Sequence, residues 1–333
     1  MESYRYSFFS LLLGLLMKSS GLFKKISDET AKIKKKGIVS LISPMLIGLI
    51  PMPGGALISA PLVEVQLKDT DLSRARMAFI NYWYRHIWEY AWPLYPGIVV
   101  MSGLIHYSVK SIIFPLIPFV FVAFLSGLFF IKGIKDQKPL DRFSFIKFLL
   151  YVSPIVFVII AILLGFNIIL TLLIPNVILF LISIWKKTFS MNTMNFSVFP
   201  AIFFIFLFKA IFGIAFRIES HPYFPGWVIF VFIILFALLS GFITGLNQAA
   251  VGIVIPFIIM ISPPENLLFN SIVGYVSLFL GILISPSHLC LVLTAKYFNT
   301  DLASMYRYIF ISMSIVVGFA IVWFFIIRIL NII

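Results

Sequence analysis

Long apolar runs recur along the whole sequence and limit the chain to a small set of folds. The clearest runs are residues 111–131, 148–165, 167–185, 198–217 and 305–328. Each is close to the length of about 20 residues that a helix needs to cross the ~30 Å hydrocarbon core of a bilayer. A transmembrane β-barrel would instead show short segments of alternating polar and apolar residues. The sequence therefore predicts an all-α, multi-pass protein of the cell membrane.

Composition and charge agree with this class. The 333 residues are 62% hydrophobic and only 11% charged, whereas a soluble domain carries about a quarter charged residues. The net charge of +13 does not indicate a nucleic-acid partner, because Lys and Arg collect in the cytoplasmic loops of membrane proteins. Membrane lipid is the expected surrounding of this chain.

The basic residues also predict its orientation. Five segments hold 19 of the 25 Lys and Arg, namely residues 18–36, 64–76, 132–147, 186–187 and 296–307. All five fall on one side if the sidedness alternates at every full span and two hairpins enter the membrane without crossing it. By the positive-inside rule that side is the cytoplasm.

Two segments are predicted to be re-entrant hairpins. Residues 38–67 are apolar but break at a tip of Pro51, Met52, Pro53, Gly54 and Gly55, and residues 226–262 carry a polar tip at 240–248. The first helix, residues 7–17, has about 11 residues and a length of roughly 17 Å, which is too short to span alone.

Two further segments are predicted to be broken helices. Residues 78–104 are interrupted by Pro93 and Pro96, and residues 268–294 by the sequence SPSH at 285–288. Proline removes a helical hydrogen bond and clashes with the preceding turn. Irregular backbone at membrane depth is tolerated only where it is buried in protein or lines a wet cavity.

The order of hairpin, broken helix and span occurs twice with opposite topology. We therefore interpret residues 1–147 and 148–333 as two inverted repeats, an arrangement typical of secondary transporters. The first repeat lacks counterparts of the spans 148–165 and 167–185, so we expect it to be short at its N-terminus. The alternative is that the short first helix works as it stands, with a partner subunit.

The segment from Ile80 to Gly97 is predicted to form one wall of a polar site. It contains Arg85, His86 and Glu89, which share a face on a helix. Glu89 is the only carboxylate inside any predicted span, and a charge at the bilayer centre costs at least about 2.5–3.5 kcal/mol. Glu89 could bind a proton or Na⁺; the alternative is a structural ion pair with Arg85.

The remaining candidate residues lie at the hairpin tips and the helix breaks. At the tips they are Met52, Pro53, Gly54, Gly55, Gly245, Asn247 and Gln248, and at the breaks Pro93, Ser285, Ser287 and His288. Backbone N–H groups at the tips suit an anion, and His288 could carry a proton or be a packing residue. Cys290, the single cysteine, excludes an intrachain disulfide and is interpreted as a packing residue.

These features favour a secondary transporter of a small organic anion, coupled to H⁺ or Na⁺ and without a further cofactor. An ion channel is an alternative, and an intramembrane metalloenzyme with zinc on His86, Glu89 and His288 is another. The sequence has no HExxH, GxSxG or P-loop motif, so we do not expect an enzyme.

Three motifs resemble a known family. They are GLIPMPGGALISAPLVE at 48–64, INYWYRHIWEYAWPLYPG at 80–97 and SPSHLCLVLTAKYF at 285–298. The chain closely resembles prokaryotic integral membrane proteins catalogued as domain of unknown function 401, whose members are usually longer at the N-terminus. This family is grouped with the ion-transporter superfamily, and the grouping implies inverted repeats, paired re-entrant hairpins and frequently a homodimer. It implies no substrate and no established binding residues.

Overall fold

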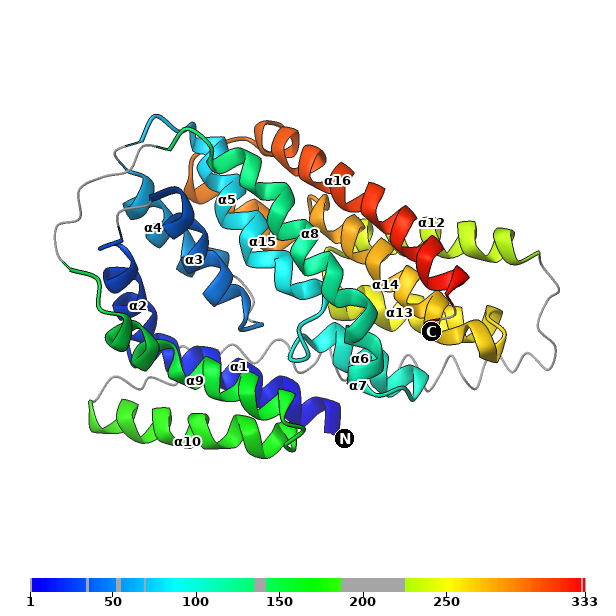
Figure 1. The fold of residues 1–333 in the computed structure, drawn as a ribbon, viewed down its shortest axis with the longest axis horizontal. Coiled ribbons are helices and arrows are strands. Elements are labelled where there is room, and N and C mark those ends of the chain that lie inside the picture. The colour runs from blue at the N-terminus through cyan, green and yellow to red at the C-terminus, as the bar shows by residue number, and fades with distance from the viewer. Residues whose placement is uncertain are drawn as a thin grey trace.

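The computed structural model describes residues 2–33, 36–51, 55–68, 70–134, 142–186, 225–330 and 332, and its regular elements are all helical (Figure 1). Within these residues five segments are long and apolar enough to cross a membrane: Val109–Ile131, Phe145–Ile162, Gly226–Thr244, Pro264–Leu283 and Leu302–Ile329. The protein is therefore all-α and multi-pass, as the sequence predicts. The predicted span 198–217 lies outside the described residues.

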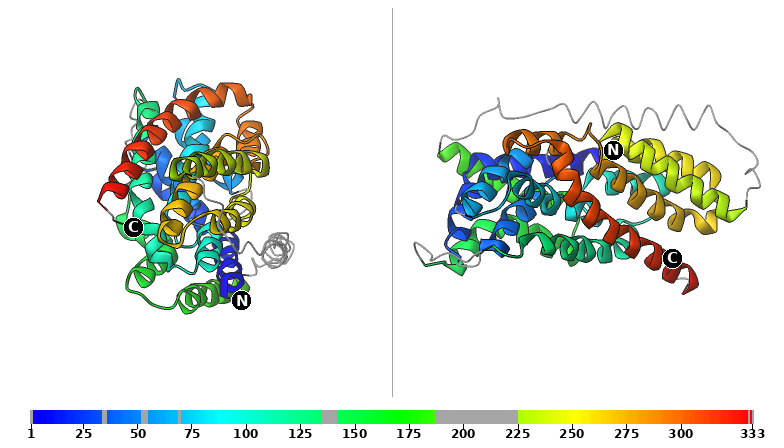
Figure 2. Two further views of the ribbon diagram at one scale, coloured as in Figure 1. Left: turned by 90° about the vertical axis from the view of Figure 1, so that its right-hand side faces the viewer. Right: turned by 90° about the horizontal axis from the view of Figure 1, so that it is seen from above.

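Four helices gather at one end of the molecule (Figures 1 and 2). They are α1 (Glu2–Ser19), α2 (Leu22–Thr30), α9 (Phe145–Leu163) and α10 (Ile168–Trp185). Packing of α1 against α10 and of α2 against α9 encloses a small apolar core, to which Ile47, Leu49, Ile50 and Leu94 also contribute. The predicted turn at 165–167 is confirmed, and the side chain of Asn167 caps α10 by accepting the N–H of Ile169 at 2.9 Å.

Two predictions for the N-terminal region are wrong, one on the length of a helix and one on the structure of a loop. Helix α1 has 18 residues rather than the predicted 11, because its polar ends continue the helix beyond the apolar run. The basic segment 18–36 is not only a loop, because it contains α2. Phe23 and Ile26 are buried on one side of α2 while Lys24 and Lys25 are exposed, a helical spacing that the charge count did not reveal.

The first predicted hairpin and broken helix lie side by side (Figure 1). Helices α3 (Lys36–Gly48) and α4 (Ala56–Leu67) pack against each other and against α5 (Arg74–His86). After α5 come the 3-10 turn η1 (Ile87–Tyr90), an irregular stretch and α6 (Pro96–Ile105). The break predicted from Pro93 and Pro96 is therefore confirmed. The next apolar segment consists of α7 (Val109–Ile113), η2 (Phe114–Leu116), α8 (Ile117–Gly127) and η3 (Leu128–Ile131).

A similar order of elements follows in the C-terminal part. This part consists of α12 (Gly226–Thr244), α13 (Asn247–Ile261), η5 (Pro264–Asn266), α14 (Leu267–Leu283), α15 (Leu289–Tyr297) and α16 (Leu302–Ile329). The break between α14 and α15 is confirmed. The polar tip predicted at 240–248 is narrower, because α12 continues to Thr244 and only Gly245 and Leu246 separate it from α13. The Thr244 hydroxyl donates to the Ser240 carbonyl at 2.8 Å, so this hydroxyl has its partner within the helix.

Helix α14 is buried along most of its length and its backbone touches that of α12. A Cβ on Gly241 would overlap the carbonyl oxygen of Leu278, and a Cβ on Gly281 would overlap the carbonyl oxygen of Leu238. The two glycines therefore act reciprocally, each leaving room for a carbonyl of the other helix. Small residues serve helix–helix contacts in membranes in this way.

We predict that Gly281→Ala destabilises the protein by about 1–3 kcal/mol, because the added methyl group overpacks a backbone contact. Gly318→Ala is the matched control, since a Cβ at Gly318 in α16 meets nothing within 4 Å. Thermal unfolding of the detergent-solubilised protein measures both. Equal unfolding temperatures for the two variants would contradict the close contact between α12 and α14.

Candidate functional site

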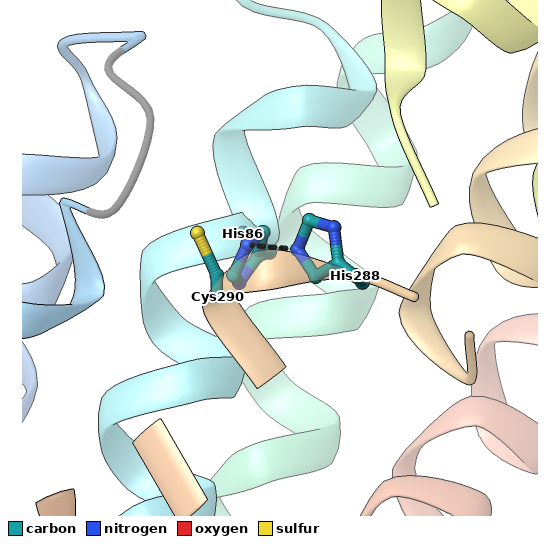
Figure 3. A group of neighbouring side chains, drawn as sticks. All are labelled: His86, His288 and Cys290. Carbon is teal, nitrogen blue, oxygen red and sulfur yellow. Dashed lines mark hydrogen bonds between the residues drawn. The ribbon is translucent and has the colours of Figure 1, made fainter. Parts of the chain in front are cut away.

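The two helix breaks meet at the side chains of His86 and His288 (Figure 3). His86 is the last residue of α5, and His288 directly precedes α15. Their Nε2 atoms are 3.0 Å apart and their ring centroids 5.0 Å apart, although 202 positions separate them in the sequence. Both residues were candidates from the sequence, and the structure brings them into contact. They are buried, with exposed fractions of 1% and 8%.

The other ring nitrogen of each histidine is fixed by a backbone carbonyl. His86 Nδ1 lies against the carbonyl oxygen of Tyr82 one turn earlier, and His288 Nδ1 is 2.7 Å from the carbonyl oxygen of Gly245. A carbonyl can only accept, so both Nδ1 atoms carry the hydrogen and donate. The orientation of both rings is therefore set by the surrounding backbone.

Glu89 lies beside this pair and is 6% exposed. One carboxylate oxygen is 3.8 Å from His86 Nε2, and the other accepts from the Asn247 side-chain amide at 3.5 Å. The Tyr275 hydroxyl donates to the backbone carbonyl of Glu89 at 2.6 Å. The predicted association of His86 with Glu89 is therefore present, and Asn247 joins them from the start of α13.

The hairpin tip at Gly245 packs directly on the second break. Gly245 has a left-handed φ of 61°, and a Cβ there would lie 2.7 Å from the carbonyl carbon of Ser287. The Ser285 hydroxyl donates to the carbonyl of Phe242 in α12 and accepts the backbone N–H of Ser287 at 3.1 Å. This segment therefore holds His288 in place.

The remaining sequence candidates have different surroundings. Arg85 is buried, and its backbone carbonyl packs against Gly48 of α3. Pro93 and Gly55 are buried, Gln248 is half-buried and Ser287 is exposed. Met52, Pro53 and Gly54 lie outside the described residues.

Aromatic side chains of α5 and the first break donate hydrogen bonds to carbonyls of neighbouring helices. The pairs are Tyr82 to Leu283 at 3.0 Å, Trp83 to Ala123 at 2.8 Å, Tyr84 to Phe124 at 3.1 Å, Trp88 to Met45 at 3.0 Å and Tyr95 to Gly48 at 2.6 Å. Backbone carbonyls near helix ends and breaks lack a helical partner. The aromatic side chains satisfy several of them, a role beyond the packing that the sequence indicates.

A family model described as a protein of unknown function (DUF401) matches residues 6–329. The chain belongs to the DUF401 family. The match covers both helix breaks and both histidines. No curated protein shows significant sequence similarity to the chain, so no residue role is transferred from a relative.

Sequence reasoning missed Cys290 as a partner of the histidines. Its thiol lies close to both, so that ligand atoms of His86, His288 and Cys290 are all within 4.8 Å of one another. The spacing His288-x-Cys290 at the start of a helix was the available signal. Tyr275 was also missed, because a tyrosine in an apolar run gives no indication of which way its hydroxyl points.

A groove of about 1150 Å³ lies between α12, α14 and α16. Its lining is mostly apolar, with Asn266, Asn270, Ser277 and Arg328 as exceptions, and it contains no residue of the two breaks. Binding sites combine apolar walls with convergent polar groups. The buried cluster at the breaks has such groups and is therefore the better candidate site.

We predict that Tyr82→Phe lowers the free energy of unfolding by about 0.5–2 kcal/mol, because the carbonyl of Leu283 loses its buried donor. Tyr107→Phe is the control, since Tyr107 is 37% exposed and its loss of a hydroxyl leaves no buried carbonyl unpaired. Thermal unfolding in detergent compares the two. An effect of Tyr107→Phe as large as that of Tyr82→Phe would count against this role.

Proposed function

We propose that the protein is a secondary transporter of a small organic anion, coupled to H⁺ or Na⁺. It consists of two inverted repeats, residues 1–147 and 148–333, each with a hairpin and a broken helix. The repeated order of elements supports this proposal: α3–α4, α5–α6 and α8 are followed later by α12–α13, α14–α15 and α16. Transporters of this type bind substrate where discontinuous helices of the two halves meet.

Helix lengths support re-entrant hairpins in part. Helices α3, α4 and α13 have 13, 12 and 15 residues, or roughly 18–23 Å at 1.5 Å per residue, which is less than the ~30 Å core. Helix α12 has 19 residues and is long enough to cross. In the proposed architecture the second hairpin therefore has one long and one short arm.

The observation that carries the proposal is the convergence of helix N-termini on the buried cluster. Helix α15 begins next to His288, and Asn247 at the start of α13 contacts both Glu89 and Gly97, near the start of α6. The N-terminal end of a helix carries a partial positive charge and free N–H donors, which favour an anion. Arg85 is also buried and adds a full positive charge at the first break.

In this mechanism the tip and break backbones bind the anion and Glu89 binds the coupling cation. Glu89 lies in the first repeat, and its carboxylate accepts a hydrogen bond from the side-chain amide of Asn247 in the second repeat. Cation binding at Glu89 would therefore change a contact between the two repeats. That coupling is what alternating access between two rigid halves requires.

We predict that Glu89→Gln reduces ion-coupled uptake into proteoliposomes by about 10-fold or more, because the amide keeps the shape of the side chain but not its charge. The transported anion is first found by a thermal-shift screen of short mono-, di- and tricarboxylates with and without Na⁺, since a ligand of the folded state raises its apparent stability. Glu265→Gln is the control, as Glu265 is exposed in η5. Unchanged coupled uptake by Glu89→Gln would refute the coupling role.

An intramembrane metalloenzyme is the second candidate, favoured by the contact of His86 with His288. Uptake experiments with the same proteoliposomes distinguish a carrier from an enzyme. A labelled acid recovered unchanged from the lumen supports a carrier, whereas recovery of a chemically altered product supports an enzyme. Single-channel currents across planar bilayers would instead support the channel alternative.

A further inference from the structure

Three potential metal ligands form a buried cluster at the meeting point of the two breaks (Figure 3). His86 comes from the end of α5, and His288 and Cys290 come from the beginning of α15. Cys290 is 6% exposed and forms no disulfide. Two imidazoles and a thiol inside a membrane protein are a costly group to bury unless their polar atoms have partners.

The contact between the two histidines needs a positive charge between them. Both Nδ1 hydrogens are committed to the carbonyls of Tyr82 and Gly245, so each neutral ring presents a lone pair at Nε2. The two Nε2 atoms nevertheless face each other at 3.0 Å. Two lone pairs repel at this distance unless a cation, either a metal ion or an added proton, lies between them.

We propose that His86, His288 and Cys290 bind a Zn²⁺ ion, with the carboxylate of Glu89 beside His86. This inference does not depend on the proposed transport function. The donor set of imidazole nitrogen, thiolate and carboxylate is the one that zinc prefers. The backbone carbonyls on the two Nδ1 atoms are the partners that orient metal-binding histidines in general.

The distances are close to those of a tetrahedral zinc site. Bond lengths of about 2.0–2.1 Å to nitrogen and about 2.3 Å to sulfur place two nitrogens about 3.3 Å apart and nitrogen about 3.6 Å from sulfur. The observed Nε2–Nε2 distance is 3.0 Å, the ligand atoms of the three residues lie within 4.8 Å, and Glu89 Oε1 is 3.8 Å from His86 Nε2. Small side-chain rotations of His86, His288 and Cys290 bring these three donors to one point.

The charges of the ligands also suit a divalent cation. On binding, the S–H bond of Cys290 breaks, the proton leaves to solvent and a zinc–sulfur bond forms. The thiolate and the carboxylate of Glu89 then carry two negative charges, which offset those of the ion in a medium of low dielectric constant. The bound ion would join residues from both predicted repeats.

Metal binding by the full-length protein in detergent tests this inference without any substrate, so its failure would leave the transport proposal untouched. After chelator treatment and Zn²⁺ addition, we expect one zinc per chain by elemental analysis. With Co²⁺ in place of zinc, we expect thiolate-to-cobalt charge-transfer absorption. Cys290→Ser should abolish that absorption, and His288→Asn should weaken zinc binding by about 100-fold or more, since loss of even a ligand's partner costs about 10–100-fold.

His106→Asn is the matched control and should leave zinc binding unchanged. His106 has a left-handed φ of 59°, a conformation that asparagine tolerates. If the cluster variants fail to fold, the Co²⁺ spectrum of the unaltered protein still decides. A spectrum without the thiolate band, zinc binding no tighter in the unaltered protein than in Cys290→Ser, or retention of another transition metal instead of zinc would overturn the proposal.

Discussion

Every backbone group freed by a helix break inside a membrane needs a partner from the protein, because lipid supplies none. This requirement explains the polar side chains near both breaks. Tyr82 and Tyr306 donate to the carbonyls of Leu283 and Ile284 at the end of α14. Tyr275 does the same for Glu89 at the first break. The segment Ile80–Gly97 is thus rich in tyrosine and tryptophan because these residues combine an apolar ring with one donor.

The same requirement brings the functional candidates together. Backbone groups at each break form hydrogen bonds to side chains from elsewhere in the chain. The two breaks and the tip at Gly245 therefore form one connected network. His288 links the tip to His86, and Asn247 links α13 to Glu89. In this DUF401 protein the network therefore gives the buried groups His86, Glu89 and His288 polar partners from distant parts of the chain.

The sequence predicts where helices stop better than which residues meet. Proline and polar residues mark the breaks at Pro93, Pro96 and 285–288, and Gly165 marks a turn, because these residues act locally on the backbone. Helix α2 was missed because its charges obscured a helical pattern. The sequence suggested the pairing of His86 with His288 only as part of the alternative zinc site, since in a chain that is apolar on all sides periodicity does not indicate which face of a helix meets another. For the same reason Cys290 was interpreted as a packing residue.

The backbone contact between α12 and α14 has a mechanical consequence. At Gly241 and Gly281 no side chains stand between the two helices, so there are no rotamers that can adjust when one helix shifts. Helix α12 leads into the tip at Gly245 and α14 leads into the second break. The two helices should therefore move as one rigid body, so that a displacement of the tip at Gly245 also displaces the second break and His288.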